Sequence, residues 1–121
     1  MFKHNHDEVW ELAGEIGVDA GLCWIGDPCY IKETPLVSGD WGAFCRKSWE
    51  LEAEAEVPGT AQWNFKHGGP GVGVHTSTGW GDGMYPVYVR KDEGRIAEVR
   101  VVFIPQETFK PEENDGETSN N

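Results

Sequence analysis

The sequence predicts a mainly β fold, an antiparallel sandwich or partly open barrel of about six to eight strands with one helix near residues 40–50. Residues 79–104 form the strongest pattern, a glycine-rich loop followed by a strand, a turn and a second strand. Sixteen Gly and seven Pro in 121 residues favour short strands joined by turns over long helices. Only one segment has helical spacing, whereas a parallel sheet requires several helical crossovers.

The hairpin at 85–104 has the clearest strand period. Alternate apolar residues on its second strand share one face: Ala97, Val99, Val101 and Phe103. Residues 92–94, Asp-Glu-Gly, suit a three-residue turn with a G1 bulge. Because no other segment is so regular, we expect the rest of the chain to pack on this hairpin.

Shorter apolar alternations predict the remaining strands. Residues 9–13 fit either a short strand or one helical turn. Strand pieces are expected at 15–20, 22–25, 62–66 and 72–76. The chain then turns polar and acidic, so we predict a single β-rich domain at 1–105 and an acidic, disordered tail at 106–121.

One helix is predicted to begin after Asp40, whose carboxylate can accept hydrogen bonds from the free N–H groups of the first turn. The residues that would share its buried face are Trp41, Phe44, Cys45, Ser48 and Trp49. The next stretch, 50–57, alternates Glu with apolar residues. As a helix it would place like charges at i, i+4 spacing, so we predict an edge strand or extended arm. A metal role for these Glu residues is an alternative.

Composition and charge argue against several function classes, although a local basic patch could still bind one phosphate. The formal charge of −11 argues against binding to nucleic acids or anionic membranes, which requires clustered Lys and Arg. Three Cys without CxxC spacing do not form a disulfide framework. The N-terminal residues lack the apolar run of a signal peptide, and no stretch approaches the ~20 apolar residues of a membrane span. We therefore expect a cytoplasmic protein.

Four pieces of sequence carry a resemblance. They read Gly-Val-Asp-Ala-Gly at 17–21, Gly-Asp-Pro-Cys-Tyr at 26–30, Ser-Thr-Gly-Trp-Gly-Asp-Gly-Met-Tyr-Pro-Val at 77–87 and Gly-Arg-Ile-Ala-Glu-Val-Arg-Val-Val-Phe at 94–103. Through them the chain resembles, over about residues 15–105, a family of small uncharacterised proteins of bacteria and their phages with the pattern VDxG…DPxY…TGxGDGxYPV. Residues 32–70 match poorly. The resemblance implies a compact β-rich domain in a bacterial or phage-related cytosolic setting, and we carry over no catalytic residue from it.

The glycine-rich loop is the best candidate for a binding site. Glycines there permit positive φ and leave N–H groups uncovered, and successive N–H groups can form an anion-binding nest. Hydroxyl groups and an indole ring add donors and a stacking face. We expect the ligand-binding residues to be Thr76, Ser77, Thr78, Gly79, Trp80, Gly81, Asp82, Gly83 and Tyr85, together with Asp27 and Tyr30. The structural alternative is a tight turn in which Asp82 caps its own backbone.

Other residues offer alternative chemistry. Asp19, Asp27 and Asp82 each lie near a Gly at a strand end, and three such oxygens could bind Ca²⁺ or Mg²⁺. Cys29 and His75 could act as nucleophile and base, although a catalytic Cys needs an electropositive setting that an acidic chain does not favour. We predict no metal, no cofactor and no catalytic residue.

These features predict a non-enzymatic protein that binds a small anionic or nucleotide-like ligand, or interacts with another protein. A phage-encoded origin would place it in the host cytoplasm, where it would capture a metabolite or block a host protein. The alternatives are a small hydrolase that uses Asp and His, or Cys and His, near the glycine-rich loop, and a purely structural or interaction protein. Six Trp and five Phe are many for one helix and a small sheet to cover, so we expect a homo-oligomer, most simply a dimer.

Overall fold

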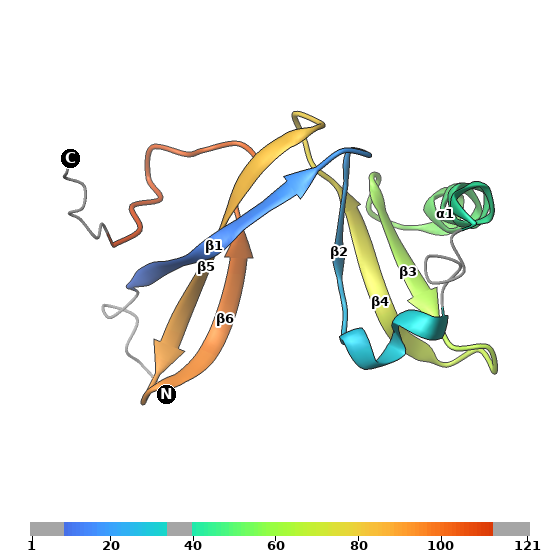
Figure 1. Cartoon of the computed structure of the whole chain (residues 1–121), viewed down its shortest axis with the longest axis horizontal. Coiled ribbons are helices and arrows are strands. Elements are labelled where there is room, and N and C mark those ends of the chain that lie inside the picture. The colour runs from blue at the N-terminus through green and yellow to red at the C-terminus, as the bar shows by residue number, and fades with distance from the viewer. Residues whose placement is uncertain (1–8, 34–39, 113–121) are drawn as a thin grey trace. The chain divides into compact units, whose positions relative to one another are not determined.

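The computed structural model of the chain describes residues 9–33 and 40–112. It contains two three-stranded antiparallel sheets, one α-helix and one 3₁₀ helix (Figure 1). The mainly β, antiparallel fold with one α-helix is therefore confirmed. Contacts divide the chain into two compact units, which are described separately: the first ends at Asp19 and resumes at Asp82, and the second is Ala20–Gly81. Within the described residues, no helix has the length and apolar character needed to cross a membrane.

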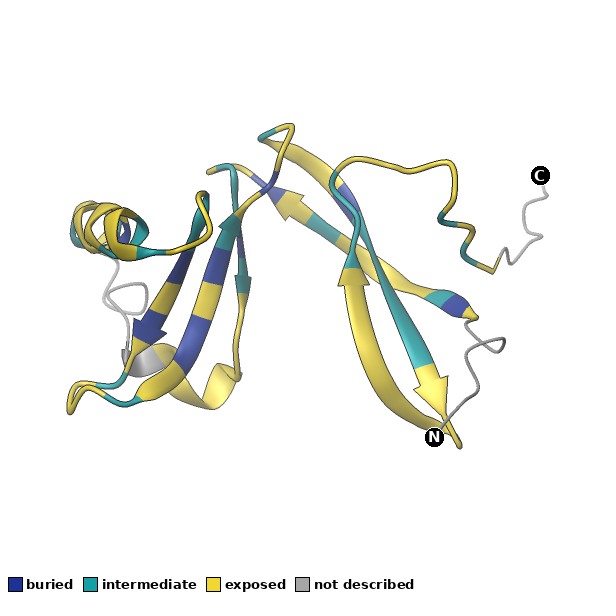
Figure 2. Ribbon diagram, turned by 180° about the vertical axis from the view of Figure 1, so that it is seen from behind, coloured by how far each residue is buried: buried dark blue, intermediate teal, exposed yellow. Residues whose placement is uncertain are grey.

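The first unit is a sheet with strand order β1-β5-β6. Its strands are β1 (Trp10–Val18), β5 (Gly83–Asp92) and β6 (Arg95–Val101). The two pieces expected at the start of the chain thus form one strand, with a bulge between Leu12 and Gly14. Most of β6 is exposed (Figure 2), so the face expected to gather the core is only partly covered.

The turn of the β5–β6 hairpin has two residues, so the prediction of a three-residue G1-bulge turn is wrong. Asp92 pairs with Arg95, and both intervening residues have positive φ, 55° at Glu93 and 81° at Gly94. Positive φ at both central positions is the type I′ geometry, whose twist matches the strands. The register shift lies instead between Arg90 and Lys91, within the ladder.

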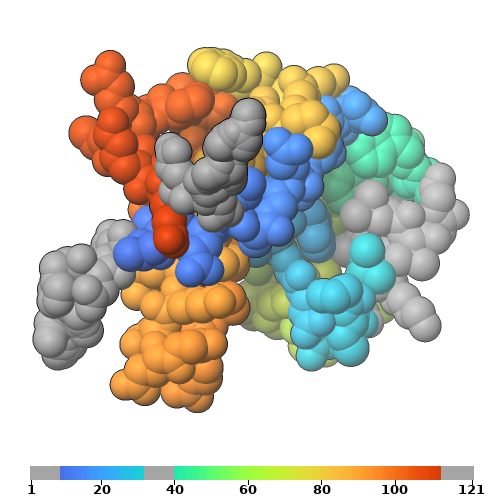
Figure 3. All heavy atoms as spheres, turned by 60° about the vertical axis from the view of Figure 1, so that its left-hand side comes forward, coloured from blue at the N-terminus to red at the C-terminus, as the bar shows by residue number. Residues whose placement is uncertain are grey.

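A terminal segment, residues 102–112, continues from β6 and packs on the first sheet. The Phe109 ring meets the rings of Trp10 and Tyr88 edge-on, with centroids 6.0 and 5.2 Å apart. The N–H of Glu112 donates to the carbonyl oxygen of Trp10 at 2.6 Å, and Figure 3 shows the red end of the described chain against blue β1. Residues 106–112 lie within the predicted tail, whose remainder, 113–121, lies outside the described residues.

The second unit is a sheet with strand order β2-β4-β3 and a helix packed on β3. Its elements are β2 (Leu22–Ile25), η2 (Pro28–Glu33), α1 (Trp41–Glu54), β3 (Thr60–Asn64) and β4 (Pro70–Ser77). Its buried core consists of Phe44, Ala61, Trp63 and Val72. This unit therefore builds a core of its own. The strand β3 lies two residues earlier than predicted.

Aromatic stacking joins helix and sheet in this core. The Phe44 ring lies parallel to the Trp63 ring, with centroids 4.8 Å apart, and the Trp24 indole meets Trp63 edge-on at 5.5 Å. Trp24 lies across Gly73, where an added Cβ would come within 2.3 Å of the indole. Only glycine leaves the space that this ring occupies.

Helix α1 begins as predicted but ends later. The Asp40 carboxylate accepts from the N–H of Ala43 at 2.9 Å, which confirms the N-cap. The helix then continues to Glu54, so the strand or extended arm predicted from residue 50 is wrong over its first half. Its buried side is marked by Phe44 and Ser48, with Leu51 packed against the core, whereas Trp41 and Trp49 are exposed.

Candidate functional site

The glycine-rich loop links β4 to β5 and belongs to both units. Thr76 to Gly81 lie in the second unit, and Asp82 to Tyr85 lie in the first. Gly79 and Gly81 have positive φ, 68° and 92°, as their position in a tight turn predicts.

The hydroxyl groups of the loop are largely engaged within it. Thr78 is fully buried, and its Oγ1 donates to the carbonyl oxygen of Gly81 at 2.6 Å. Oγ1 of Thr76 donates to the carbonyl oxygen of Ser77 at 3.1 Å. The Trp80 side chain is 67% exposed, so it does not belong to the core. The tight turn is thus well supported, and Trp80 remains accessible to a ligand.

The remaining predicted site residues have other partners. Asp27 directly precedes η2 and caps its first turn, because its Oδ1 accepts from the N–H of Cys29 at 2.9 Å. Tyr30 packs edge-on against Phe65, with centroids 5.1 Å apart. Tyr85 is buried in the first unit and meets Phe103 edge-on at 5.2 Å. Asp82 and Gly83 are exposed.

A buried hydrogen-bond chain lies between α1 and the second sheet, and sequence patterns gave no sign of it. His75 is 1% exposed. Trp63 Nε1 donates to its Nδ1 at 2.9 Å, and its Nε2 lies 2.7 Å from Oε2 of Glu52. Since Nδ1 accepts from the indole N–H, the imidazole proton resides on Nε2 and is donated to the carboxylate. Helix, β3 and β4 are thereby connected by one polar chain, Trp63–His75–Glu52.

The hydrogen bonds to Trp63 and Glu52 make His75 unsuited to the role of general base that was considered for it. A general base needs a free nitrogen within reach of a substrate, whereas both nitrogens of His75 are engaged and the ring is buried. Cys29 lies on η2, outside this hydrogen-bond chain. Among residues 9–33 and 40–112, no group of three or more His, Cys, Asp or Glu could hold a metal ion.

The thiols differ in their surroundings. All three are free, with Cys23 buried, Cys45 half-buried and Cys29 exposed. Burial raises the pKa of the Cys23 thiol, because desolvation disfavours the thiolate. Cys23 therefore behaves as a packing residue and not as a nucleophile.

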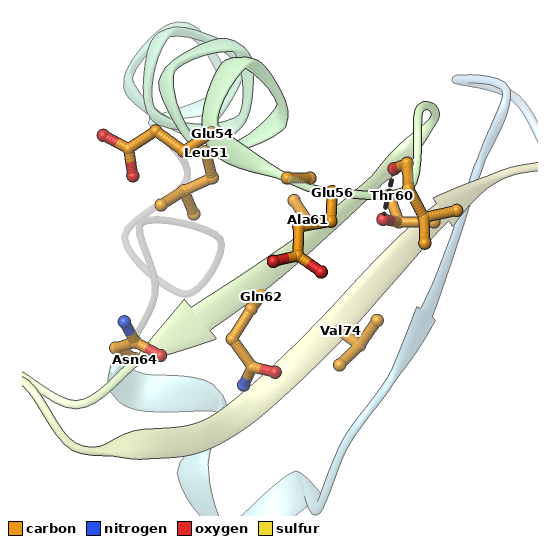
Figure 4. Close-up of a pocket in the computed structure, with 10 residues that line it drawn as sticks. Leu51, Glu54, Glu56, Thr60, Ala61, Gln62, Asn64 and Val74 are labelled. Carbon is orange, nitrogen blue, oxygen red and sulfur yellow. Dashed lines mark hydrogen bonds between the residues drawn. The ribbon is translucent and has the colours of Figure 1, made fainter.

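One pocket of about 500 Å³ lies along the outer side of β3, below the end of α1 (Figure 4). Its charged residues are Glu54 and Glu56, and its polar residues include Gln62 and Asn64. The Thr60 hydroxyl is engaged, since it donates to the carbonyl oxygen of Val57 at 2.7 Å. We name this pocket of about 500 Å³ the acidic pocket. Its carboxylates oppose the binding of an anion.

A second pocket of about 470 Å³ lies beside the other end of β3, and we name it the lysine pocket. Its lining residues are Lys47, Leu51, Trp63, Asn64, Phe65, Lys66 and Gly68. Two cations and no carboxylate line it, in a chain of charge −11. Lys47 has only a weak ion pair, 3.9 Å from Glu50 with both side chains more than half exposed.

The lysine pocket was not predicted, although in the sequence each of its two Lys residues lies close to an apolar residue that also lines the pocket. Lys47 precedes Leu51 by one helical turn, and Lys66 directly follows Phe65 at the end of the β3 region. Only the packing of α1 on β3 brings the two cations to one place.

The comparisons with known proteins give a family but no activity. Residues 7–101 match the family model described as Protein of unknown function (DUF4241), and no curated protein and no solved structure matches the chain. The chain belongs to this family, which confirms that it is one of an uncharacterised set.

Proposed function

We propose that this DUF4241 protein is a non-enzymatic binding protein for a small anionic ligand that carries a ring, and that the lysine pocket is its site. The observation that carries the proposal is the lining of that pocket. Two Lys flank apolar and aromatic side chains, and no carboxylate is among them. This arrangement is favourable for a ring with a phosphate or carboxylate attached, the ligand class that the sequence suggests.

The size and surface of the pocket suit such a ligand. Small-molecule sites are concave, about 300–1,000 Å³ in volume, and mostly apolar with a few polar groups; this pocket has about 470 Å³. Trp63, Phe65 and Leu51 offer apolar contact, and the two ammonium groups offer mobile donors to an anion.

The Trp63 ring is held before any ligand arrives. Its N–H is engaged by His75, and its face is stacked on Phe44. A ring fixed on two sides loses little freedom on binding, which favours affinity. The buried polar chain thus supports the pocket from beneath.

The lining also favours binding over catalysis. None of the lining residues is a carboxylate, an imidazole or a thiol, the groups that most often act as acid, base or nucleophile. Capture of a nucleotide-like metabolite fits this set of residues better than hydrolysis does. A phage-encoded protein acting in its host's cytoplasm is one setting for such capture.

Isothermal titration calorimetry with AMP, adenosine and inorganic phosphate tests the proposal. AMP should bind more tightly than either part alone, because it uses both the rings and the cations. Lys47→Gln and Lys66→Gln should each weaken AMP binding about tenfold, as the loss of one charge-assisted hydrogen bond implies. The matched control is Arg46→Gln, which removes the same charge from the same helix outside the pocket lining.

Two outcomes would contradict the proposal. Equal weakening by Arg46→Gln and Lys66→Gln would indicate a non-specific charge effect. Recovery of a new product after incubation, instead of unchanged AMP, would favour the hydrolase alternative.

A further inference from the structure

Arg100 in the first unit packs against two aromatic rings that meet edge-on beside it. Its guanidinium carbon lies 4.4 Å from the Trp10 centroid and 4.4 Å from the Phe109 centroid. The three residues come from β1, β6 and the terminal segment, and Tyr88 packs edge-on against Phe109 beside them. Contact with the two rings holds the guanidinium in place through cation–π attraction.

The in-plane N–H groups of Arg100 are available to another partner. Two other cations of this sheet, Arg90 and Lys91 on β5, have carboxylate partners. Arg90 pairs with Glu98 at 2.5 Å, and Lys91 lies 3.7 Å from Glu11. The described residues give Arg100 no such ion pair. An arginine with free edges presents the planar fork that matches a carboxylate or phosphate.

Arg100 lines a pocket of about 300 Å³. The pocket is lined by Trp10, Arg100, Gln106, Thr108, Phe109 and Lys110. Lys110 adds a second cation, and Gln106 and Thr108 add an amide and a hydroxyl that can donate hydrogen bonds. No carboxylate is among the lining residues, although the chain has 21 Asp and Glu against 10 Lys and Arg.

We propose that this second pocket, the arginine pocket, binds the oxyanion of a small molecule, a phosphate or a carboxylate. The guanidinium binds it through its in-plane N–H groups, and Lys110 contributes the second charge. The aromatic rings hold the arginine in place and exclude water from one side of it. The arginine pocket belongs to the first unit and the lysine pocket to the second, so this proposal does not depend on the proposed function.

Two-dimensional ¹H–¹⁵N NMR of the full chain, titrated with inorganic phosphate and separately with acetate, tests the proposal. We expect saturable shifts of the Trp10 indole N–H and of the Thr108 and Lys110 amides. Shifts with phosphate alone identify a phosphate site, and shifts with acetate alone identify a carboxylate site.

Three variants assign the shifts to the pocket. Arg100→Lys keeps the charge but removes the planar fork, so it should weaken binding roughly fivefold or more. Lys110→Gln, at an exposed position, should weaken it by a similar factor and remain folded. Arg95→Gln, at the exposed hairpin end of β6, is the matched control and should leave the affinity unchanged.

The proposal is overturned if neither anion produces saturable shifts, or if Lys110→Gln and Arg95→Gln weaken binding equally. If Arg100→Lys disturbs the aromatic packing, Lys110→Gln alone decides. Lys47→Gln should not alter these shifts, which keeps this test separate from that of the lysine pocket.

Discussion

Replacing Trp63 with Phe removes the only N–H that satisfies Nδ1 of His75 among the described residues, while most of the ring stays stacked on Phe44. A buried acceptor left without a donor costs about 1–3 kcal/mol. The smaller ring buries roughly 40 Å² less apolar surface, which adds about 1 kcal/mol. We expect Trp63→Phe to lower the free energy of unfolding by roughly 2–4 kcal/mol, a large share of the ~5–15 kcal/mol typical of a domain.

Urea unfolding followed by circular dichroism measures this loss, and a double-mutant cycle isolates its cause. In a His75→Phe background the buried indole N–H has lost its acceptor, so Trp63→Phe removes an unsatisfied donor and should cost about 1 kcal/mol or less there. Trp49→Phe is the matched control: Trp49 is 65% exposed, and its replacement should change stability by less than about 0.5 kcal/mol. Equal costs of Trp63→Phe in both backgrounds would refute the hydrogen-bond explanation.

Gly73→Ala should destabilise by about 1–3 kcal/mol in thermal or urea unfolding, because the new Cβ would collide with Trp24. The free energy of unfolding should fall as the pH rises into the alkaline range, because burial raises the pKa of Cys23 in the folded chain and the unfolded chain therefore releases this proton at a lower pH. Cys23→Ala should reduce the dependence of the unfolding free energy on pH in this range. Trp80→Ala should leave the melting temperature nearly unchanged, because this side chain is 67% exposed, and any loss of ligand affinity would then assign a binding role to the loop. Light scattering should detect a homo-oligomer, and Val99→Lys, at a residue 63% exposed on β6, should shift it towards a 13.5 kDa species; a monomer before mutation would refute the expectation.

The sequence was most informative where one local interaction decides the structure. The Asp40 cap needs only the N–H of Ala43 three residues away, and the hairpin strands follow from strict alternation. The end of α1 does not follow from the local repulsion between Glu residues, because that repulsion is only ~0.2–0.5 kcal/mol per pair and tertiary contacts of the helix outweigh it. Glu52 accepts from His75, 23 residues away, and Leu51 packs on the core.

The candidate sites were harder to predict for the same physical reason. Glycines at 79 and 81 predict a turn, and their positive φ confirms it. The sequence does not indicate that the Thr78 hydroxyl donates to the carbonyl oxygen of Gly81. The lysine pocket unites cations 19 positions apart, and the arginine pocket unites residues 10, 100 and 110. Neither pairing leaves a periodic signal, because each arises from packing between elements.

The pairing of Val18 with Gly83 in the β1–β5 ladder has a consequence for how such a chain could be assembled. These two residues face each other across antiparallel strands, yet 64 residues lie between them in the sequence. At the base of the intervening segment, the N–H of Thr78 donates to the carbonyl oxygen of Gly21 at 3.1 Å, which holds its own two ends together. The second unit is thus an insertion whose entry and exit meet, the arrangement that tolerates excision and circular permutation. A short turn from Val18 to Gly83 would connect β1, β5 and β6 as a continuous three-stranded meander.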